Sequence, residues 1–145
     1  MPINNFPFLR LSPSSPLRPV LFTKIVYPNT GLMLDEPAII DTGADICAAP
    51  AELAEDLGID LERGIPKPVS TGNGVAVAFT HICRIEVYHT ANLLKGCSDI
   101  VYKMVDISVD FMPDLPFVLL GTKDFLGQFC LIADYPSKLF SVKHP

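Results

Sequence analysis

The chain has 145 residues, of which 49% are hydrophobic, and it carries no polar low-complexity tract, so we expect one compact domain with a modest core. A formal net charge of −5 provides no basic surface for nucleic acid or anionic lipid, and neither partner is expected. The N-terminus has no basic stretch followed by an apolar run, and no later segment reaches transmembrane length, which predicts a soluble, cytoplasmic protein without a membrane partner.

The first residues differ in composition from the rest of the chain. Residues 1–19 are rich in Pro, Ser and Asn and show little apolar periodicity. Proline restricts helix formation, and so few regularly spaced apolar side chains are not expected to form a packed element. We therefore predict an extended N-terminal arm over residues 1–19 and a folded domain over residues 20–145.

The folded part begins with two predicted strands. Residues 20–27 are β-branched and aromatic and are followed by the turn-like segment Pro28-Asn-Thr-Gly31, as is typical of a strand. Residues 37–40 form a second apolar run that leads directly into Asp41-Thr42-Gly43. This order places a single carboxylate at a sharp turn after a strand.

A helix and a hairpin follow. Residues 50–58 have proline in the first turn, early acidic residues, Leu53 and Leu57 at helical spacing, and glycine as a stop signal, which predicts a helix. Residues 68–79 place Asn73-Gly74 between two extended segments, which is the strongest short-range sign of a tight hairpin. The second arm of that hairpin is expected to continue as a strand to Tyr88.

The C-terminal half consists of further short strands joined by turns. The predicted elements are a connection over 89–100, a strand over 101–109, a stiff proline-containing loop over 112–116, a strand over 117–120, a short helix over 122–126, and a hairpin that pairs 129–133 with 139–142. Many short strands and few helices indicate a mainly β domain with one or two short helices.

The cysteines do not form a recognisable metal-binding or disulfide pattern. The chain has four of them, with no Cys-x-x-Cys pair and no histidine placed to complete a zinc site. We interpret Cys47, Cys83, Cys97 and Cys130 as free thiols that serve mostly as small core residues.

The most informative segment is Ala38-Ile-Ile-Asp41-Thr42-Gly43-Ala44-Asp45, in which an apolar strand delivers one carboxylate to a turn that contains glycine. It resembles the active-site motif of retropepsin-like aspartic proteases. Three further features follow in the order that this family requires: the glycine hairpin Thr71–Gly74, the apolar-apolar-Gly unit Leu119-Leu120-Gly121, and a short helix near Phe125. Asp-Thr-Gly alone also fits an ordinary turn, so the order of the features carries the interpretation.

The resemblance spans residues 20–142 and implies a closed β-barrel lobe of the acid-protease type. The motif occurs once, in a chain with the length of one lobe, whereas double-lobed relatives carry it twice. The resemblance therefore implies a symmetric homodimer in which the Asp41 side chains of both subunits meet on the two-fold axis. The closing hairpin is longer than in retroviral enzymes and is more similar to that of cellular and bacterial single-lobe members.

The resemblance also assigns residues to a site. Asp41 from each subunit is the catalytic carboxylate: one takes a proton from water while the other protonates the carbonyl oxygen of an extended peptide, without a metal or cofactor. Thr42 and Gly43 complete the active-site loop, with Thr42 bracing the opposite loop across the dimer axis. The residues expected to bind substrate are Ala44, Asp45 and the flap residues Thr71, Gly72, Asn73 and Gly74.

Two other functions are compatible with the sequence: a non-catalytic dimerisation or peptide-binding module on the same fold, and a small-ligand barrel in which Asp41 only caps a turn. Asp45 equally fits a solvated carboxylate, and the glycine hairpin fits an ordinary surface loop. Lys123 stands where the family often has an arginine that braces the dimer, and lysine lacks the bidentate fork of a guanidinium group.

Overall fold

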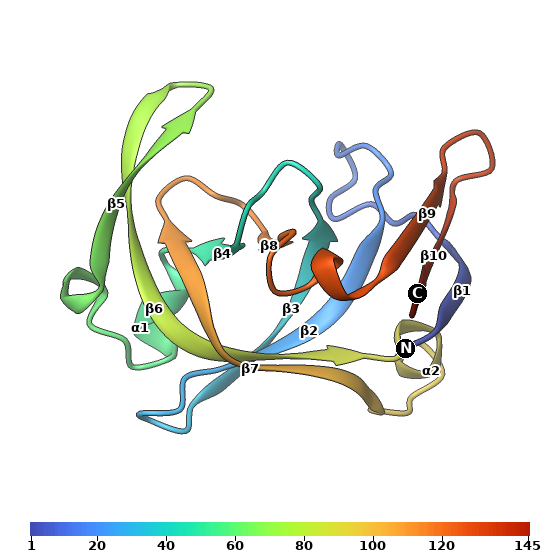
Figure 1. Cartoon of the computed structure of the whole chain (residues 1–145), viewed down its shortest axis with the longest axis horizontal. Helices are drawn as coiled ribbons and strands as arrows, with labels where there is room; N and C mark the ends of the chain where they lie inside the picture. The colour runs from blue at the N-terminus through green and yellow to red at the C-terminus, as the bar shows by residue number, and fades with distance from the viewer.

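Seven strands form one sheet that closes into a barrel (Figure 1). The computed structural model describes residues 1–145. Neighbouring strands follow the order β2-β3-β8-β4-β7-β6-β5, and β2 also pairs with β6, so six strands close the barrel and β5 extends beyond it. The strands are β2 (Val20–Val26), β3 (Met33–Ile40), β4 (Cys47–Pro50), β5 (Ile65–Thr71), β6 (Gly74–Tyr88), β7 (Ile100–Met112) and β8 (Val118–Leu120). The predicted mainly β barrel lobe is confirmed.

β3 and β7 extend beyond their predicted bounds because polar residues at their ends also pair with the neighbouring strands. β3 begins at Met33, and its residues Asp35 and Glu36 pair with β2 although they interrupt the apolar run. β7 continues past Val109 to Met112, with Asp110 paired directly to Thr80 of β6. Hydrogen-bonding partners, rather than local hydrophobicity, therefore decide where these strands end.

A second, smaller sheet contains both ends of the chain, which lie on the same side of the molecule in Figure 1. Its strand order is β1 (Ile3–Pro7), β10 (Leu139–Lys143) and β9 (Cys130–Asp134), all antiparallel. The predicted closing hairpin is thus confirmed.

The prediction that residues 1–19 contain no packed element is wrong for β1. Ile3, Phe6 and Phe8 are buried, and the Phe6 ring packs edge-on against Phe140 with 5.8 Å between centroids. The register shifts between Ile3 and Phe6, and Asn5 has a φ of 48°, so a bulge brings residues three apart to one face. This bulge removes the two-residue alternation by which a strand is recognised in sequence.

The helices are short and partly displaced from their predicted positions. The helix predicted over 50–58 is reduced to α1 (Leu53–Asp56), because Pro50 belongs to β4. Gly58, two residues after the helix, has a φ of 69° and prevents its continuation, as predicted. α2 (Thr90–Leu93) lies in the segment interpreted as a connection. Two 3₁₀ turns complete the set: η1 (Leu61–Arg63) and η2 (Leu126–Gln128).

The helix predicted over 122–126 is wrong in extent, because only its last residue belongs to a helical turn, η2. None of the helices has the length and apolarity needed to span a membrane.

The barrel interior is filled by the inward-facing side chains of its strands, packed together with the buried side of the terminal sheet. The largest fully buried side chains of this shared core include Phe111, Phe125, Phe140, Leu21 and Ile25. Phe125 precedes η2, so the segment after β8 is fixed to the barrel by an aromatic anchor.

Strand β8 lies between β3 and β4 and supports the loop that joins them. Ile40 of β3 pairs in parallel with Leu120, while Ala48 of β4 pairs in antiparallel fashion with Leu119. Gly121 follows directly, and a Cβ atom built on it would lie 2.5 Å from the carbonyl carbon and oxygen of Ile46. Only glycine fits beneath this loop without moving main-chain atoms.

Replacement of Gly121 by alanine is expected to lower the free energy of unfolding by about 2–3 kcal/mol, because the new methyl group would displace the main chain of the loop above it. Urea unfolding followed by circular dichroism measures this loss. Gly72→Ala is the matched control, because a Cβ atom there would meet nothing within 4 Å. Equal stability of the two variants would contradict the packing described for Gly121.

The thiols divide into two classes, which corrects the interpretation of all four as mostly core residues. Cys47 and Cys83 are buried, whereas Cys97 and Cys130 are exposed. Burial raises the pKa of the Cys47 thiol to about 11 and that of Cys83 to about 12, so neither forms the reactive thiolate near neutral pH.

A chromogenic thiol reagent at pH 8 is therefore expected to modify two thiols in the native protein and four in urea, because only Cys97 and Cys130 are accessible to the reagent in the folded state. Absorbance counts the modified thiols, and mass mapping assigns them. Rapid modification of Cys47 or Cys83 in the native state would contradict this assignment.

Candidate active site

Asp41 stands at the end of β3, where the chain turns away from the barrel. Its N–H donates to the carbonyl oxygen of Leu120 at 3.1 Å, which continues the pairing of β3 with β8 by one residue. The N–H of Gly43 donates to Asp41 Oδ1 at 2.8 Å, and the N–H of Ala44 donates to the Asp41 carbonyl at 3.3 Å. The carboxylate is half-buried and accepts one hydrogen bond, from the main-chain N–H of Gly43 in its own loop.

The segment after Gly121 holds the other side of this loop. The N–H of Thr122 donates to the Ala44 carbonyl at 2.9 Å, and the N–H of Lys123 donates to the Asp45 carbonyl at the same distance. Thr122 Oγ1 also donates to the Asp45 carbonyl, at 3.2 Å. The main chain of Asp45 is thus fixed from behind while its carboxylate stays exposed, and Lys123 acts here through its main chain.

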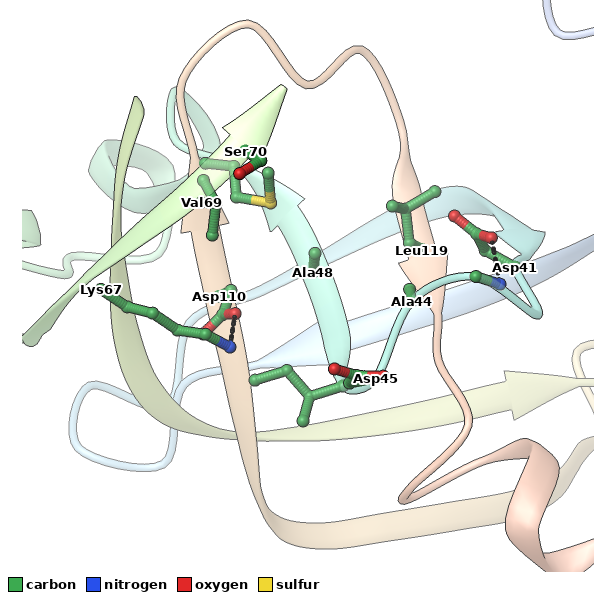
Figure 2. A pocket seen from close by; sticks show the side chains of 12 residues that line it. Asp41, Ala44, Asp45, Ala48, Lys67, Val69, Ser70, Asp110 and Leu119 are labelled. Atoms are coloured by element: carbon green, nitrogen blue, oxygen red, sulfur yellow. Dashed lines mark hydrogen bonds and ion pairs between the residues drawn. The ribbon is translucent and has the colours of Figure 1, made fainter. Parts of the chain in front are cut away.

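A cleft of about 370 Å³ opens in front of the loop (Figure 2). Four of the predicted site residues line it: Asp41, Gly43, Ala44 and Asp45. Its other lining residues come from β4, β5, β7 and β8 and from the end of the loop: Ile46, Ala48, Lys67, Val69, Ser70, Asp110, Met112 and Leu119. The loop that carries Asp41 and the strand β5 that leads to the glycine hairpin therefore face one another across a single cleft.

The predicted flap residues lie at the tip of the hairpin formed by β5 and β6, which projects away from the barrel in Figure 1. The turn itself is Gly72-Asn73, since Thr71 pairs with Gly74, so the turn residues are one position earlier than the Asn-Gly pair suggested. Gly74 carries the positive φ, 114°, that favours glycine. Thr71 Oγ1 donates to the Gly74 carbonyl at 2.9 Å and fastens the turn.

A second cleft of about 340 Å³ separates this tip from the loop after β7. It is lined by Thr71, Gly72 and Asn73 together with residues of the proline-containing loop, Met112–Leu115. Thr42 and Gly74 line neither cleft, and the Thr42 side chain is exposed. The structure thus places the other predicted site residues around two adjoining clefts, which share Met112 and Ser70.

A polar network around the buried carboxylate of Asp110, in the wall of the first cleft, was not predicted from the sequence. Lys67 Nζ lies 2.8 Å from Asp110 Oδ2 (Figure 2). Thr80 Oγ1 donates to Asp110 Oδ1 at 2.6 Å. The available signal was an acidic residue within the apolar run Val109-Asp110-Phe111. An acid in such a run is rarely buried without a partner, but the partner itself is not apparent from the sequence.

The remaining titratable residues do not assemble a metal centre. The structure contains no group of three or more His, Cys, Asp or Glu side chains placed to hold a metal ion. The first cleft presents three carboxylates, one lysine ammonium group and main-chain groups.

Comparison with known proteins agrees with this geometry. Residues 34–123 match a family described as aspartyl protease, a segment that contains the Asp41 loop, the glycine hairpin and Gly121. The structure is similar to a crystal structure of a retropepsin-like aspartic protease from Rickettsia conorii, with a TM-score of 0.59, 20% identity, and coverage of 85% of this chain and 96% of that chain. At this identity the likeness is one of fold.

No curated protein matches the chain. The family match extends over more than half of the sequence and includes the Asp-Thr-Gly motif, the glycine hairpin and Gly121. The chain therefore belongs to the aspartyl protease family and has its retropepsin-like fold.

Proposed function

We propose that this protein is a homodimeric aspartic endopeptidase that hydrolyses extended peptide segments by activating water between two Asp41 carboxylates. Family membership itself indicates a peptidase with peptide substrates. The observation that carries the finer proposal is the state of Asp41: a half-buried carboxylate, held by one main-chain N–H and facing an open cleft beneath a projecting hairpin. A carboxylate that only capped a turn would not require such a cleft.

The chemistry requires two carboxylates. Peptide hydrolysis without a covalent intermediate needs one group to take a proton from water and another to protonate the carbonyl oxygen. This chain supplies one such carboxylate at the motif, so the second comes from a second copy related by two-fold symmetry. The exposed Thr42 side chain makes no hydrogen bond within the chain and is free to contact the opposite loop.

In the proposed mechanism, the ionised Asp41 removes a proton from water as the water oxygen adds to the carbonyl carbon. The protonated Asp41 of the other subunit gives its proton to the carbonyl oxygen, producing a tetrahedral diol. The C–N bond then breaks as the nitrogen receives a proton from one carboxyl group and a diol hydroxyl gives a proton to the other carboxylate, which releases an amine and a carboxylic acid and leaves one proton on the pair. Two carboxylates that meet on the two-fold axis cannot both be ionised, so the proposed pair holds one proton and activity requires mildly acidic solution.

The substrate is proposed to lie extended between the Asp41 loop and β5. An extended peptide can exchange main-chain hydrogen bonds with a strand edge, and β5 is the last strand of its sheet. The small side chain of Ala44 permits close approach of the peptide main chain, and the exposed Asp45 carboxylate can accept hydrogen bonds from its N–H groups. Gly72 and Asn73 would close over the peptide from the hairpin tip.

Asp41→Asn is expected to lower kcat/KM by about 10³-fold, because an amide can neither accept the proton from water nor share one with its partner. Cleavage of a mixed peptide library between pH 4 and 7, monitored by mass spectrometry, measures the loss. Asp106→Asn is the matched control, because Asp106 is exposed, lies outside both clefts and has a positive φ that asparagine tolerates. A protein that binds peptides without cleaving them would instead support the non-catalytic peptide-binding module.

Mixing of subunits tests the shared site directly. When wild-type protein is equilibrated with a ninefold excess of Asp41→Asn, random pairing leaves about one wild-type chain in ten with a wild-type partner, so activity is expected to fall to about a tenth. Substrate in large excess prevents the variant from acting by competition. The control is the same mixture assayed before subunits exchange, and unchanged activity after full equilibration would contradict a site shared between two chains.

A further inference from the structure

The first cleft contains one basic side chain, and its position is set by the strand that carries it. Lys67 and Val69 alternate along β5 with the exposed residues Pro66 and Pro68, and both half-buried side chains face the cleft. Across the hairpin, Lys67 pairs with Ala78, whose small side chain leaves room for the lysine to extend over β6. The ammonium group thereby reaches a carboxylate on β7, Asp110, as Figure 2 shows.

Both carboxylate oxygens of Asp110 already have partners within the chain, and its side chain is buried. One of its oxygens accepts from Lys67 Nζ at 2.8 Å, and the other accepts from Thr80 Oγ1 at 2.6 Å. Only 5% of its side-chain surface is exposed, against 45% for Lys67. The group that this network presents to a ligand is therefore the ammonium, while the carboxylate holds it in place.

Lys67 retains unused hydrogen-bonding capacity. An ammonium group has three donors, and the Asp110 carboxylate is its one acceptor within the chain. Ile46, Ala48 and Val69 line the same cleft with apolar surface, so a bound peptide would remove water from Lys67 and strengthen a charge-assisted hydrogen bond formed there. These properties suit an acidic side chain of a bound peptide.

We propose that Lys67 is a specificity-determining residue that binds a glutamate or aspartate side chain of the substrate in the subsite between β5 and β7, with Asp110 as its positioning residue. The inference rests on the proposed function, in that the cleft holds a peptide. A basic substrate side chain would meet the Lys67 ammonium at this subsite, and Asp110 is too enclosed to attract it. The exposed Asp45 lies at the Asp41 loop and is assigned to the peptide main chain.

The test compares peptides that differ only in Glu, Gln or Lys at each of the four positions on either side of a cleaved bond. At one position, wild-type protein at pH 6 is expected to show a kcat/KM about tenfold higher for Glu than for Gln, which is typical of one charge-assisted contact. The Glu/Gln ratio should fall toward one as the pH is lowered to 4, because the peptide carboxyl group becomes protonated.

Variants separate recognition from folding. Lys67→Met leaves Asp110 buried without its cation and can destabilise the protein, so Lys67→Met combined with Asp110→Asn is tested beside it. Both are expected to reduce the Glu/Gln ratio to about one, whereas Lys67→Arg should retain a preference for Glu. Lys95→Met is the control, because Lys95 is exposed, forms no ion pair and lines neither cleft. If the Lys67–Asp110 pair had only a structural role, its removal would change kcat/KM for all peptides equally and leave the Glu/Gln ratio unchanged, and this result would overturn the proposal.

A binding measurement distinguishes failure of this inference from failure of the proposed function. Fluorescein-labelled octapeptide pools with one fixed Glu or Gln are titrated with Asp41→Asn protein, which retains the cleft, and polarisation is recorded. About tenfold tighter binding of the Glu pool, lost in the Lys67→Met and Asp110→Asn background, supports the subsite even if no peptide is cleaved. Equal binding of the two pools overturns the subsite, whatever the outcome for hydrolysis.

Discussion

The contact of Gly121 with the main chain of Ile46 determines how Asp41 is presented to the cleft. β8 is inserted between β3 and β4, so the loop joining those two strands has to pass over the end of β8. Because Gly121 has no side chain, the loop can descend far enough for Thr122 and Lys123 to form main-chain hydrogen bonds with it. The carboxylate is therefore fixed by backbone geometry, and most of the surrounding side chains are free to vary without moving it.

The same architecture separates a rigid wall of the cleft from a projecting one. The Asp41 loop rests on the barrel, whereas the β5–β6 hairpin leaves the barrel at its base and is attached there by the pairing of β6 with β7 and by the bond between Lys67 and Asp110. Beyond this attachment, the two strands of the hairpin pair only with each other, up to Thr71 and Gly74. A hairpin anchored at the base and free at the tip can admit a long polymer from the side and then cover it.

Local signals account for most of what could be predicted from the sequence. The Asp41 turn, the glycine hairpin and the apolar unit before Gly121 are each defined by neighbouring residues, and each lies close to its expected position. β1 was missed because the bulge at Asn5 disrupts its alternation and its partner is the last strand of the chain. Asp110 was missed because its buried state depends on Lys67, which is distant in sequence and meets it only after the barrel closes. Contacts of this kind depend on tertiary structure and produce no periodic pattern in the sequence.

The pairing of Ile3 with Val142 also has a consequence for the order of events during synthesis. β1 cannot pair until β10 has been synthesised, and until then Phe6 and Phe8 lack the hairpin that covers them. A chain truncated or stalled before β10 would therefore expose an unpaired β1 and its aromatic side chains. Closure of so long a loop makes completion of the native state a slow, late event relative to formation of the local hairpins.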